Sequence, residues 1–340
     1  MKLTYLVCTV LFVLAGIGAN AQTSGGNIQQ QPARAAASHE APRSFVTVQY
    51  ASGLEISLPV LITENGILFQ AKVNDSPDPL YFTIDSGAAA TYLDAGVAER
   101  LGVIPSGEGN VQGAGEGTVR VQHLRNVRFE LPGLTTVHPE INTADLSGLE
   151  KEGWGQPISG FFGYDFIRQF VVTIDYDNGL LTLADPATFK YHGSGEITPI
   201  EFITRLPYVS GIIKIPGVPA TKALFLVDCT SSDGANHQLI RKSTGSLRHT
   251  RGGVGLGKPT ETVVGRLDYF KLGKFIVRGA PSLPFRDEGE TTGQIGSAIL
   301  KRFKVTFNYS KSQLILEPGK MYGKPFSGLG DEQSPPGGTR

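Results

Sequence analysis

The chain has 340 residues, of which 40% are hydrophobic, and its 31 Lys and Arg residues balance its 31 Asp and Glu residues. Without net charge it has no overall field that would recruit nucleic acid or an acidic membrane, so we expect neither as a partner. Its length and apolar content are enough for a core divided between two lobes.

The first residues have the pattern of a secretory signal. Lys2 precedes an apolar run from Leu6 to Ile17, and Ala19-Asn20-Ala21 forms a small-x-small cleavage site. The apolar run is too short for a membrane-spanning helix. We therefore expect a signal peptide at residues 1–21, cleaved after Ala21, an extracytoplasmic (periplasmic or secreted) protein, and no stable membrane insertion afterwards. A retained anchor is the alternative.

Cysteine and histidine usage argues against several kinds of site. Cleavage would remove Cys8 and leave Cys229 as the only cysteine, so no disulfide can form within the mature chain. No His accompanies Cys229 in a recognisable pattern, and we interpret it as a buried, unreactive thiol. The six His residues form no His-x-x-x-His pair, so we expect no metal site and no cofactor.

Between the signal and the end of the chain, composition divides the sequence into three parts. Residues 22–43 are rich in Gln, Ala, Ser and Gly and predict a disordered linker. Short β-prone runs separated by turn residues then continue to Pro318, which predicts a mainly β body. Beyond Pro318 the chain turns to Gly, Pro, Ser and charged residues, and we predict a flexible tail at residues 319–340.

Within the β body, one apolar run ends in an unusual way. Leu80-Tyr81-Phe82-Thr83-Ile84 leads directly into Asp85-Ser86-Gly87. Asp and Gly are both poor in strand interiors, so this strand is predicted to end in a tight loop that holds a carboxylate at its tip. An isolated motif of this kind is usually only a strand entering a turn. The rest of the chain, however, gives this motif a more specific interpretation.

A second copy of the pattern follows the first. Residues 80–85 correspond to 223–228, 113–117 to 253–257, 160–163 to 293–296, 172–176 to 305–309, and 181–186 to 314–318. Two copies are too few and too long for a solenoid. We therefore predict two similar β lobes, at residues 44–190 and 205–318, joined by residues 191–204.

These motifs together resemble those of a known family. The Asp85-Ser86-Gly87 loop, a glycine-rich segment further on, and Phe161-Phe162-Gly163 before a short helix are similar to the retropepsin-like and pepsin-like aspartic peptidases, especially bacterial secreted members with two lobes. The resemblance covers residues 55–318. It implies a mainly β, two-lobed pepsin/retropepsin-like acid protease fold, in which each lobe is a small closed β-barrel-like unit and a cleft separates the lobes.

The resemblance also implies a catalytic pair, Asp85 from the first lobe and Asp228 from the second. Two carboxylates about 3 Å apart cannot both ionise, so they share one proton. The ionised one can activate a water while the protonated one donates to the scissile carbonyl. Ser86 would connect the two loops through its hydroxyl, and Gly87 would let backbone N–H groups approach the carboxylates.

Two glycine-rich segments are expected to act as flaps over this pair. The first contains Gly113, Gly115 and Gly117, and the second contains Gly253, Gly255 and Gly257. Beneath them a peptide or protein substrate would bind in an extended conformation through main-chain hydrogen bonds.

The second copy departs from the family pattern directly after Asp228. Cys229 stands where Ser or Thr is expected, and Thr230 stands where Gly is expected. A thiol is a weak hydrogen-bond partner, and Thr adds a β-branched side chain where the backbone must approach closely. Three outcomes stay open: Asp228 completes the pair, two Asp85 loops meet in a homodimer, or the protein only binds peptide or glycan. We expect the first, in a monomeric aspartic endopeptidase (a hydrolase).

Three further aspartates receive structural interpretations. Asp165 follows Phe161-Phe162-Gly163 and is predicted to be the N-cap of a short helix. Asp175 is interpreted as a strand-end residue and Asp233 as a turn residue.

Overall fold

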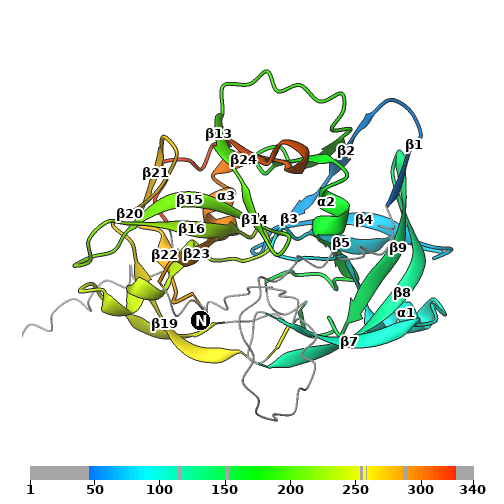
Figure 1. Ribbon diagram of the computed structural model, residues 1–340, viewed down its shortest axis with the longest axis horizontal. Coiled ribbons are helices and arrows are strands. Elements are labelled where there is room, and N and C mark those ends of the chain that lie inside the picture. Colours follow the sequence, from blue (N-terminus) through cyan, green and yellow to red (C-terminus); the bar gives the residue numbers. More distant parts are fainter. Residues whose placement is uncertain are drawn as a thin grey trace, which may run out of the picture.

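The computed structural model describes residues 46–113, 117–149, 153–252, 256–257, 259–285 and 290–326. The predicted signal peptide and linker lie outside the described residues. Strands dominate the described part of the chain, and the helices there are short (Figure 1). The prediction of a mainly β fold is therefore confirmed. None of these helices has the length and apolar character needed to cross a membrane.

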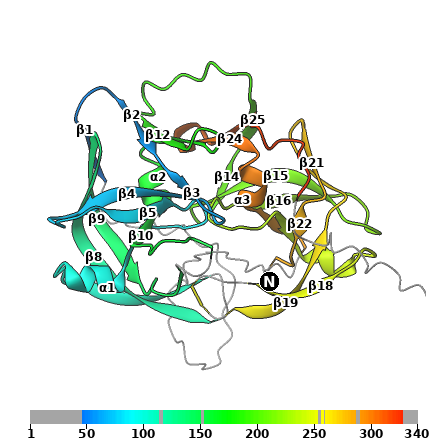
Figure 2. The same cartoon turned by 180° about the vertical axis from the view of Figure 1, so that it is seen from behind.

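The first lobe is built on one nine-stranded sheet, seen on the left in Figure 2. Its elements are β1 (Thr47–Tyr50), β3 (Leu61–Ile62), β4 (Ile67–Val73), β5 (Leu80–Ile84), β6 (Tyr92–Asp94), α1 (Ala95–Arg100), β7 (Gly107–Gln112), β8 (Thr118–Leu131), β9 (Leu134–Ala144), β10 (Gly160–Phe162) and α2 (Tyr164–Ile167). The strand order is β1-β9-β6-β10-β5-β4-β8-β7, with β3 on β4. Because β8 also pairs with β9, the sheet closes into the predicted barrel-like unit.

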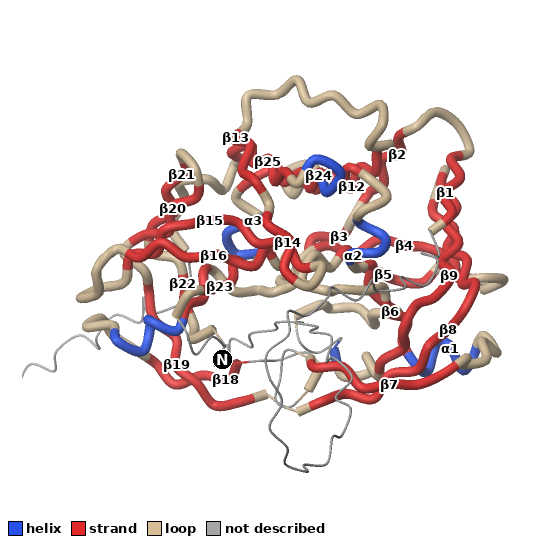
Figure 3. Tube along the Cα trace, in the orientation of Figure 1, coloured by secondary structure: helices blue, strands red, loops and turns tan. Residues whose placement is uncertain are grey.

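The second lobe divides its strands between a seven-stranded and a three-stranded sheet (Figure 3). Its elements are β14 (Glu201–Ile203), β15 (Leu206–Lys214), β16 (Thr221–Val227), β17 (Ala235–His237), the 3-10 helix η2 (Gln238–Lys242), β18 (Arg248–Gly252), β19 (Thr260–Arg266), β20 (Tyr269–Leu272), β21 (Phe275–Arg278), β22 (Pro281–Ser282), β23 (Thr292–Ile295) and α3 (Ser297–Leu300). The larger sheet has the order β17-β23-β16-β15-β20-β21 with β14 on β15, and the smaller has the order β18-β19-β22.

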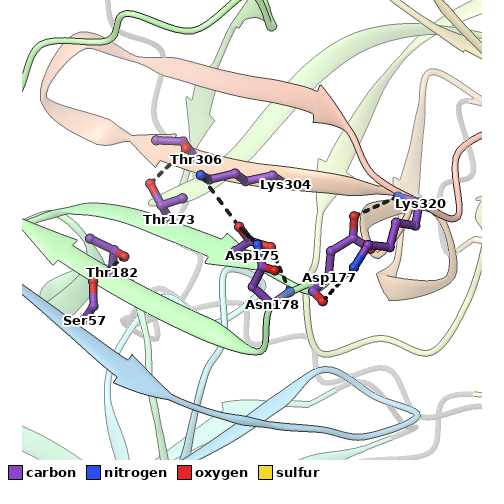
Figure 4. A network of polar contacts seen from close by, with 9 residues as sticks. All are labelled: Ser57, Thr173, Asp175, Asp177, Asn178, Thr182, Lys304, Thr306 and Lys320. Carbon is purple, nitrogen blue, oxygen red and sulfur yellow. Dashed lines mark hydrogen bonds and ion pairs between the residues drawn. The ribbon is translucent and has the colours of Figure 1, made fainter.

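A six-stranded sheet joins the lobes. It contains β2 (Glu55–Pro59), β11 (Val171–Asp175), β12 (Leu180–Ala184), β13 (Glu196–Pro199), β24 (Phe303–Asn308) and β25 (Gln313–Pro318), and the 3-10 helix η3 (Tyr309–Lys311) links its last two strands. The order is β13-β25-β24-β11-β12-β2, so β11 of the first lobe pairs with β24 of the second. At the centre of that pair the hydroxyls of Thr173 and Thr306 lie 2.9 Å apart (Figure 4).

The segment between the predicted lobes contributes to this arrangement. Residues 191–204, which the sequence predicts only as a connection, contain β13 and β14. β13 completes one edge of the shared sheet by pairing with β25. The two lobes are therefore joined by a continuous hydrogen-bonded sheet in addition to the chain connection.

One hydrophobic core runs from the first lobe through the shared sheet into the second lobe. Phe162, Ile174, Val305 and Phe225 belong to the same buried cluster. Burial of each such side chain stabilises the fold by roughly 1.5–3 kcal/mol. This continuous core fixes the position of one lobe relative to the other.

The start of the predicted tail packs against the second lobe. The Tyr322 ring lies 5.4 Å from the Phe275 ring and 5.2 Å from the Phe303 ring, measured between centroids. The Arg302 guanidinium lies 3.6 Å from the centroid of the Phe326 ring. Residues 319–326 are thus held in place, and the remainder of the predicted tail lies outside the described residues.

Candidate active site

Equivalent strands of the two lobes deliver Asp85 and Asp228. β5 ends at Ile84, beside the parallel strand β10, and β16 ends at Val227, beside the parallel strand β23. The Asp85 amide donates to the Phe162 carbonyl at 2.9 Å, and the Asp228 amide donates to the Ile295 carbonyl at 2.9 Å. Each carboxylate therefore begins a loop whose backbone is fixed by its neighbouring strand.

The two loops are connected by reciprocal hydrogen bonds. The Ser86 hydroxyl donates to the Val227 carbonyl at 2.8 Å and accepts from the Cys229 amide at 3.0 Å. In return the Cys229 thiol donates to the Ile84 carbonyl at 3.1 Å. Cys229 thus occupies the place in the second loop that Ser86 occupies in the first.

Burial keeps this thiol protonated. Desolvation, and after it the neighbouring Asp85 carboxyl, raise the pKa of Cys229 to about 12. A protonated thiol can donate a hydrogen bond but is a poor nucleophile. The structure therefore gives Cys229 a position suited to connecting the loops, as a buried and unreactive group.

At Gly87 the two loops approach each other closely. A methyl group added at Gly87 would lie 2.7 Å from Cγ and 2.8 Å from Oδ2 of Asp228. The Gly87 amide meanwhile donates to Asp85 Oδ1 at 2.9 Å. The Asp228 carboxyl therefore lies against the backbone that holds Asp85, and any side chain at this position would separate the pair.

Asp85 has few hydrogen-bond donors around it. Its side chain is 1% exposed, and its Oδ2 atom is buried without a hydrogen-bond partner. Burial, and then the charge of Asp228, raise the pKa of Asp85 well above its usual range, because both disfavour the ionised form.

Asp228 is much better supplied with donors. Its Oδ1 accepts from the Thr230 amide at 3.0 Å, the Thr230 hydroxyl at 2.9 Å and the Ser231 amide at 3.1 Å. Its Oδ2 accepts from Gln294 Nε2 at 2.7 Å. Desolvation raises the pKa of Asp228 to about 7, against the hydrogen bonds from Thr230 and Ser231, which lower it.

The difference in donors decides which carboxyl is ionised. Hydrogen bonds to a carboxylate favour its charged form, and Asp228 accepts them on both oxygens. Asp85 has an oxygen without a partner and the more strongly raised pKa. Both observations favour the protonated form more strongly at Asp85 than at Asp228.

Thr230 does not separate the loops, although a β-branched residue was expected to hinder close approach there. Its amide donates to Asp228 Oδ1 as the Gly87 amide donates to Asp85 Oδ1. Its hydroxyl turns toward the pair and donates to Asp228 Oδ1. A residue that looked like a defect in the sequence is thus a donor to the dyad.

A loop of the first lobe supports the dyad loop of the second. A methyl group on Gly66 would lie 2.7 Å from the Cys229 carbonyl oxygen. From α3 and the residue after it, the Ser297 hydroxyl donates to the Glu64 carbonyl at 3.1 Å and Lys301 Nζ donates to the same carbonyl at 2.6 Å. These contacts hold the Asp228 loop against the first lobe.

The glycine-rich segments lie in two hairpins, β7–β8 and β18–β19. Both hairpins lie on the side of β5 and β16 that is opposite the six-stranded sheet (Figures 1 and 2). Gly117 and Gly257 have positive φ angles, 83° and 104°, which favour glycine. Gly115, Gly253 and Gly255 lie outside the described residues.

The two hairpins touch each other. A methyl group on Gly113 would lie only 2.1 Å from the Leu256 carbonyl oxygen. Leu256 itself is buried in an apolar cluster of the first lobe that includes Val111, Tyr92 and Phe161. With the hairpins in contact, Asp85 and Asp228 are 1% and 0% exposed.

Sequence reasoning missed Gln294. In the alignment of the two copies it corresponds to Phe161, so a polar residue in an otherwise apolar motif was the available signal. Its contact with Asp228 depends on the pairing of β23 with β16.

The helix-capping prediction for Asp165 is wrong. The helix begins at Tyr164 and its N-cap is Gly163, which makes no side-chain cap. Asp165 lies inside the first turn, and its Oδ1 accepts from the Thr91 hydroxyl at 2.7 Å. Asp175 ends β11, as expected for a strand-end residue. Asp233 follows the dyad loop and is 3% exposed, and its charge raises the pKa of Asp228.

Comparison with known proteins agrees with this geometry. The family model of the aspartyl proteases matches residues 69–166, which include Asp85-Ser86-Gly87 and the first hairpin. By sequence, the first lobe is similar to the aspartyl protease family. No curated protein matches the sequence.

The likeness extends to the whole architecture. The crystal structure of the aspartic proteinase from Irpex lacteus superposes with a TM-score of 0.52 at 13% identity, covering 79% of this chain and 99% of that chain. The described chain thus has the pepsin-like fold, including a second lobe that the family model does not reach. Within the described ranges, no group of three or more His, Cys, Asp and Glu residues is arranged to hold a metal ion.

Proposed function

We propose that this protein is an aspartic endopeptidase that hydrolyses peptide bonds with a water activated between Asp85 and Asp228. The observation that carries the proposal is the contact of the Asp228 carboxyl with Gly87, whose amide binds the Asp85 carboxyl. The family and the fold support a peptidase, and this contact supports a single-chain dyad.

The donor pattern supports a different role for each carboxyl. Ionised Asp228 takes a proton from the water as its oxygen attacks the peptide carbonyl carbon. Protonated Asp85 donates its proton to the carbonyl oxygen, which gives a neutral tetrahedral diol. When the diol collapses, Asp228 gives its proton to the leaving nitrogen and Asp85 recovers the one it donated. Both carboxyls return to their starting states, and no covalent intermediate forms.

The substrate would be a peptide in an extended conformation beneath the two hairpins. Strand edges can bind such a chain through main-chain hydrogen bonds. Because the hairpin tips meet at Gly113 and Leu256, binding would begin with their separation. The continuous core between the lobes and the pairing of β11 with β24 support activity as a monomer.

The compartment remains part of the proposal. The signal-like sequence at residues 1–21 supports secretion or a periplasmic location. In that compartment the two lobes, which contain no disulfide, would depend on packing for their stability. The core shared between the lobes provides that packing.

One observation favours a second candidate, a protein that binds peptides without cleaving them. The Thr230 hydroxyl already occupies a hydrogen-bonding site on the dyad, at 2.9 Å from Asp228 Oδ1. If that hydroxyl excludes the water, the fold would retain its binding surface but lose hydrolysis.

Asp85→Asn and Asp228→Asn, assayed separately on an unstructured protein substrate between acid and neutral pH, distinguish these functions. We expect each variant to lose about 10²–10⁴-fold in kcat/KM, the usual contribution of general acid–base catalysis. We also expect a transition-state mimic with a central hydroxyl to inhibit the wild type.

The contrary outcomes are distinct. If only Asp85→Asn is inactive, two Asp85 loops act in a homodimer. If the wild type binds the mimic without cleaving any substrate, the binding function is correct. Near-UV circular dichroism of each variant checks that the fold is retained.

A further inference from the structure

Gln294 contacts the dyad from the middle of the second lobe's sheet. It lies on β23 between β16 and β17, in register with Leu226 and Asn236. The side chain is 1% exposed, and its Nε2 donates to Asp228 Oδ2 at 2.7 Å. A central strand and complete burial leave this side chain little freedom, so the contact is a fixed part of the site.

The first lobe has no counterpart to this contact. The corresponding residue, Phe161, packs on the Tyr92 ring with the centroids 4.9 Å apart. Asp85 Oδ2, the equivalent of the oxygen that Gln294 binds, is buried without a partner. One carboxyl of the pair is therefore held on both oxygens, and the other is held on one side only.

The acidic groups around Asp228 oppose its ionisation, and a hydrogen-bond donor counteracts them. Asp85 faces it from the opposite loop, and Asp233, which accepts a hydrogen bond from Asn236, faces it from the end of its own loop. Both are acidic and oppose a second negative charge nearby, while Cys229 is neutral and adds none. Apart from the Thr230 and Ser231 donors on Oδ1, the Gln294 amide supplies the hydrogen bond that favours ionisation from the Oδ2 side.

We propose that Gln294 is a positioning residue that keeps Asp228 ionised and oriented, and so assigns the roles of base to Asp228 and acid to Asp85. The inference rests on the proposed function for its catalytic meaning, but the protonation it describes can be measured without any substrate. A Gln amide is suited to this task because it is a neutral donor whose hydrogen bond strengthens when the acceptor is charged.

The test is Gln294→Met, which keeps the length of the side chain and removes its donor. Two readouts are compared with the wild type: titration of ¹³C-labelled aspartate carboxyls by NMR, and the pH profile of kcat/KM. Loss of a hydrogen bond to the charged form should raise the lower of the two dyad pKa values by about one unit. The acid limb of the activity profile should move upward by the same amount.

Gln169→Met is the matched control. It makes the same chemical change at a glutamine whose amide donates to the main-chain carbonyl of Asp165. It should leave both readouts unchanged. If Gln294→Met does not fold, Gln294→Asn retains a polar side chain but withdraws the amide by one methylene, and the same upward shift is expected.

The outcomes separate this inference from the proposed function. An upward shift of the carboxyl titration in a protein without hydrolytic activity supports the role of Gln294 while removing the peptidase. A peptidase whose carboxyl titration and acid limb are unchanged in Gln294→Met and Gln294→Asn overturns the role of Gln294 and leaves the proposed function intact.

Discussion

The two lobes hold their aspartate loops with equivalent contacts but different residues. In the first, Ser86 connects the loops and Gly87 donates its amide to the carboxylate; in the second, Cys229 and Thr230 occupy the equivalent places. Only the first lobe is matched by the family model. The site thus depends on where amides and short polar side chains lie, so a lobe can lose the sequence motif and keep the geometry.

The two loops do not tolerate substitution equally at the position where the family has glycine, which is Gly87 in the first loop and Thr230 in the second. Gly87 lies against the Asp228 carboxyl, whereas the side chain of Thr230 turns toward the dyad and finds a hydrogen-bond acceptor there. The loops meet asymmetrically, and only the first loop needs glycine.

Of the variants that compare the two lobes, those at Gly87 and Thr230 should differ most in activity. Gly87→Ala places a methyl group 2.7 Å from Asp228 Cγ, and we expect at least about a 10²-fold loss of kcat/KM, as displacement of a catalytic group by about 1 Å produces. Thr230→Gly removes one of several donors to Asp228 and should change kcat/KM by less than tenfold. Steady-state kinetics on one peptide substrate measures both. Equal losses in the two variants would contradict the asymmetry.

The pH dependence of stability should show the cost of burying the pair. The pKa of Asp228 is raised to about 7 in the folded protein, against about 3.9 for an unfolded aspartate. The folded state therefore binds more protons between these values, and stability falls as pH rises from about 4 through 7. We expect a loss on the order of a few kcal/mol, measured by urea unfolding.

Asp228→Asn provides the control for that measurement, since it removes the titrating group and keeps the shape. Its unfolding free energy should fall less over the same pH range than that of the wild type, because only Asp85 still has a raised pKa. A wild type whose stability is constant or rises between pH 4 and 7 would show that the dyad is not buried in solution as it is here.

The smallest expected effects are on stability, in variants of Ser86 and Cys229, the two residues that connect the loops. Ser86→Ala removes two hydrogen bonds between the lobes and should cost roughly 1–3 kcal/mol, since it leaves the Val227 carbonyl and the Cys229 amide unpaired. Cys229→Ser should change stability by less than about 1 kcal/mol, because a hydroxyl can replace the thiol as donor to Ile84. Thermal unfolding of the two variants, side by side, tests whether the residues have the same role.

Much of this arrangement could be predicted from local sequence. The ending of a β-prone run in Asp85-Ser86-Gly87 predicted the loop, and the recurrence of the run before Asp228 predicted its partner. The mainly β, two-lobed fold is confirmed. The catalytic roles, the cleaved signal and the extracytoplasmic location stay predictions.

Other features could not be found in this way because they depend on contacts between distant segments. Asp165 was assigned as a helix cap from its neighbours, but its partner is Thr91, in the loop before β6. Gln294 occupies the position of Phe161 in the second copy, and its contact with Asp228 requires β23 and β16 to lie side by side.

By itself the sequence determined the β-rich class, the two loops and the identity of the acids, because alternation, turn residues and recurrence are encoded along the chain. The tertiary structure alone decided how the acids differ. Protonation depends on which donors, charges and apolar groups surround each carboxyl, and some of these come from strands more than sixty residues away in sequence, as Gln294 does for Asp228. Pairing of those strands therefore gives two identical side chains different surroundings.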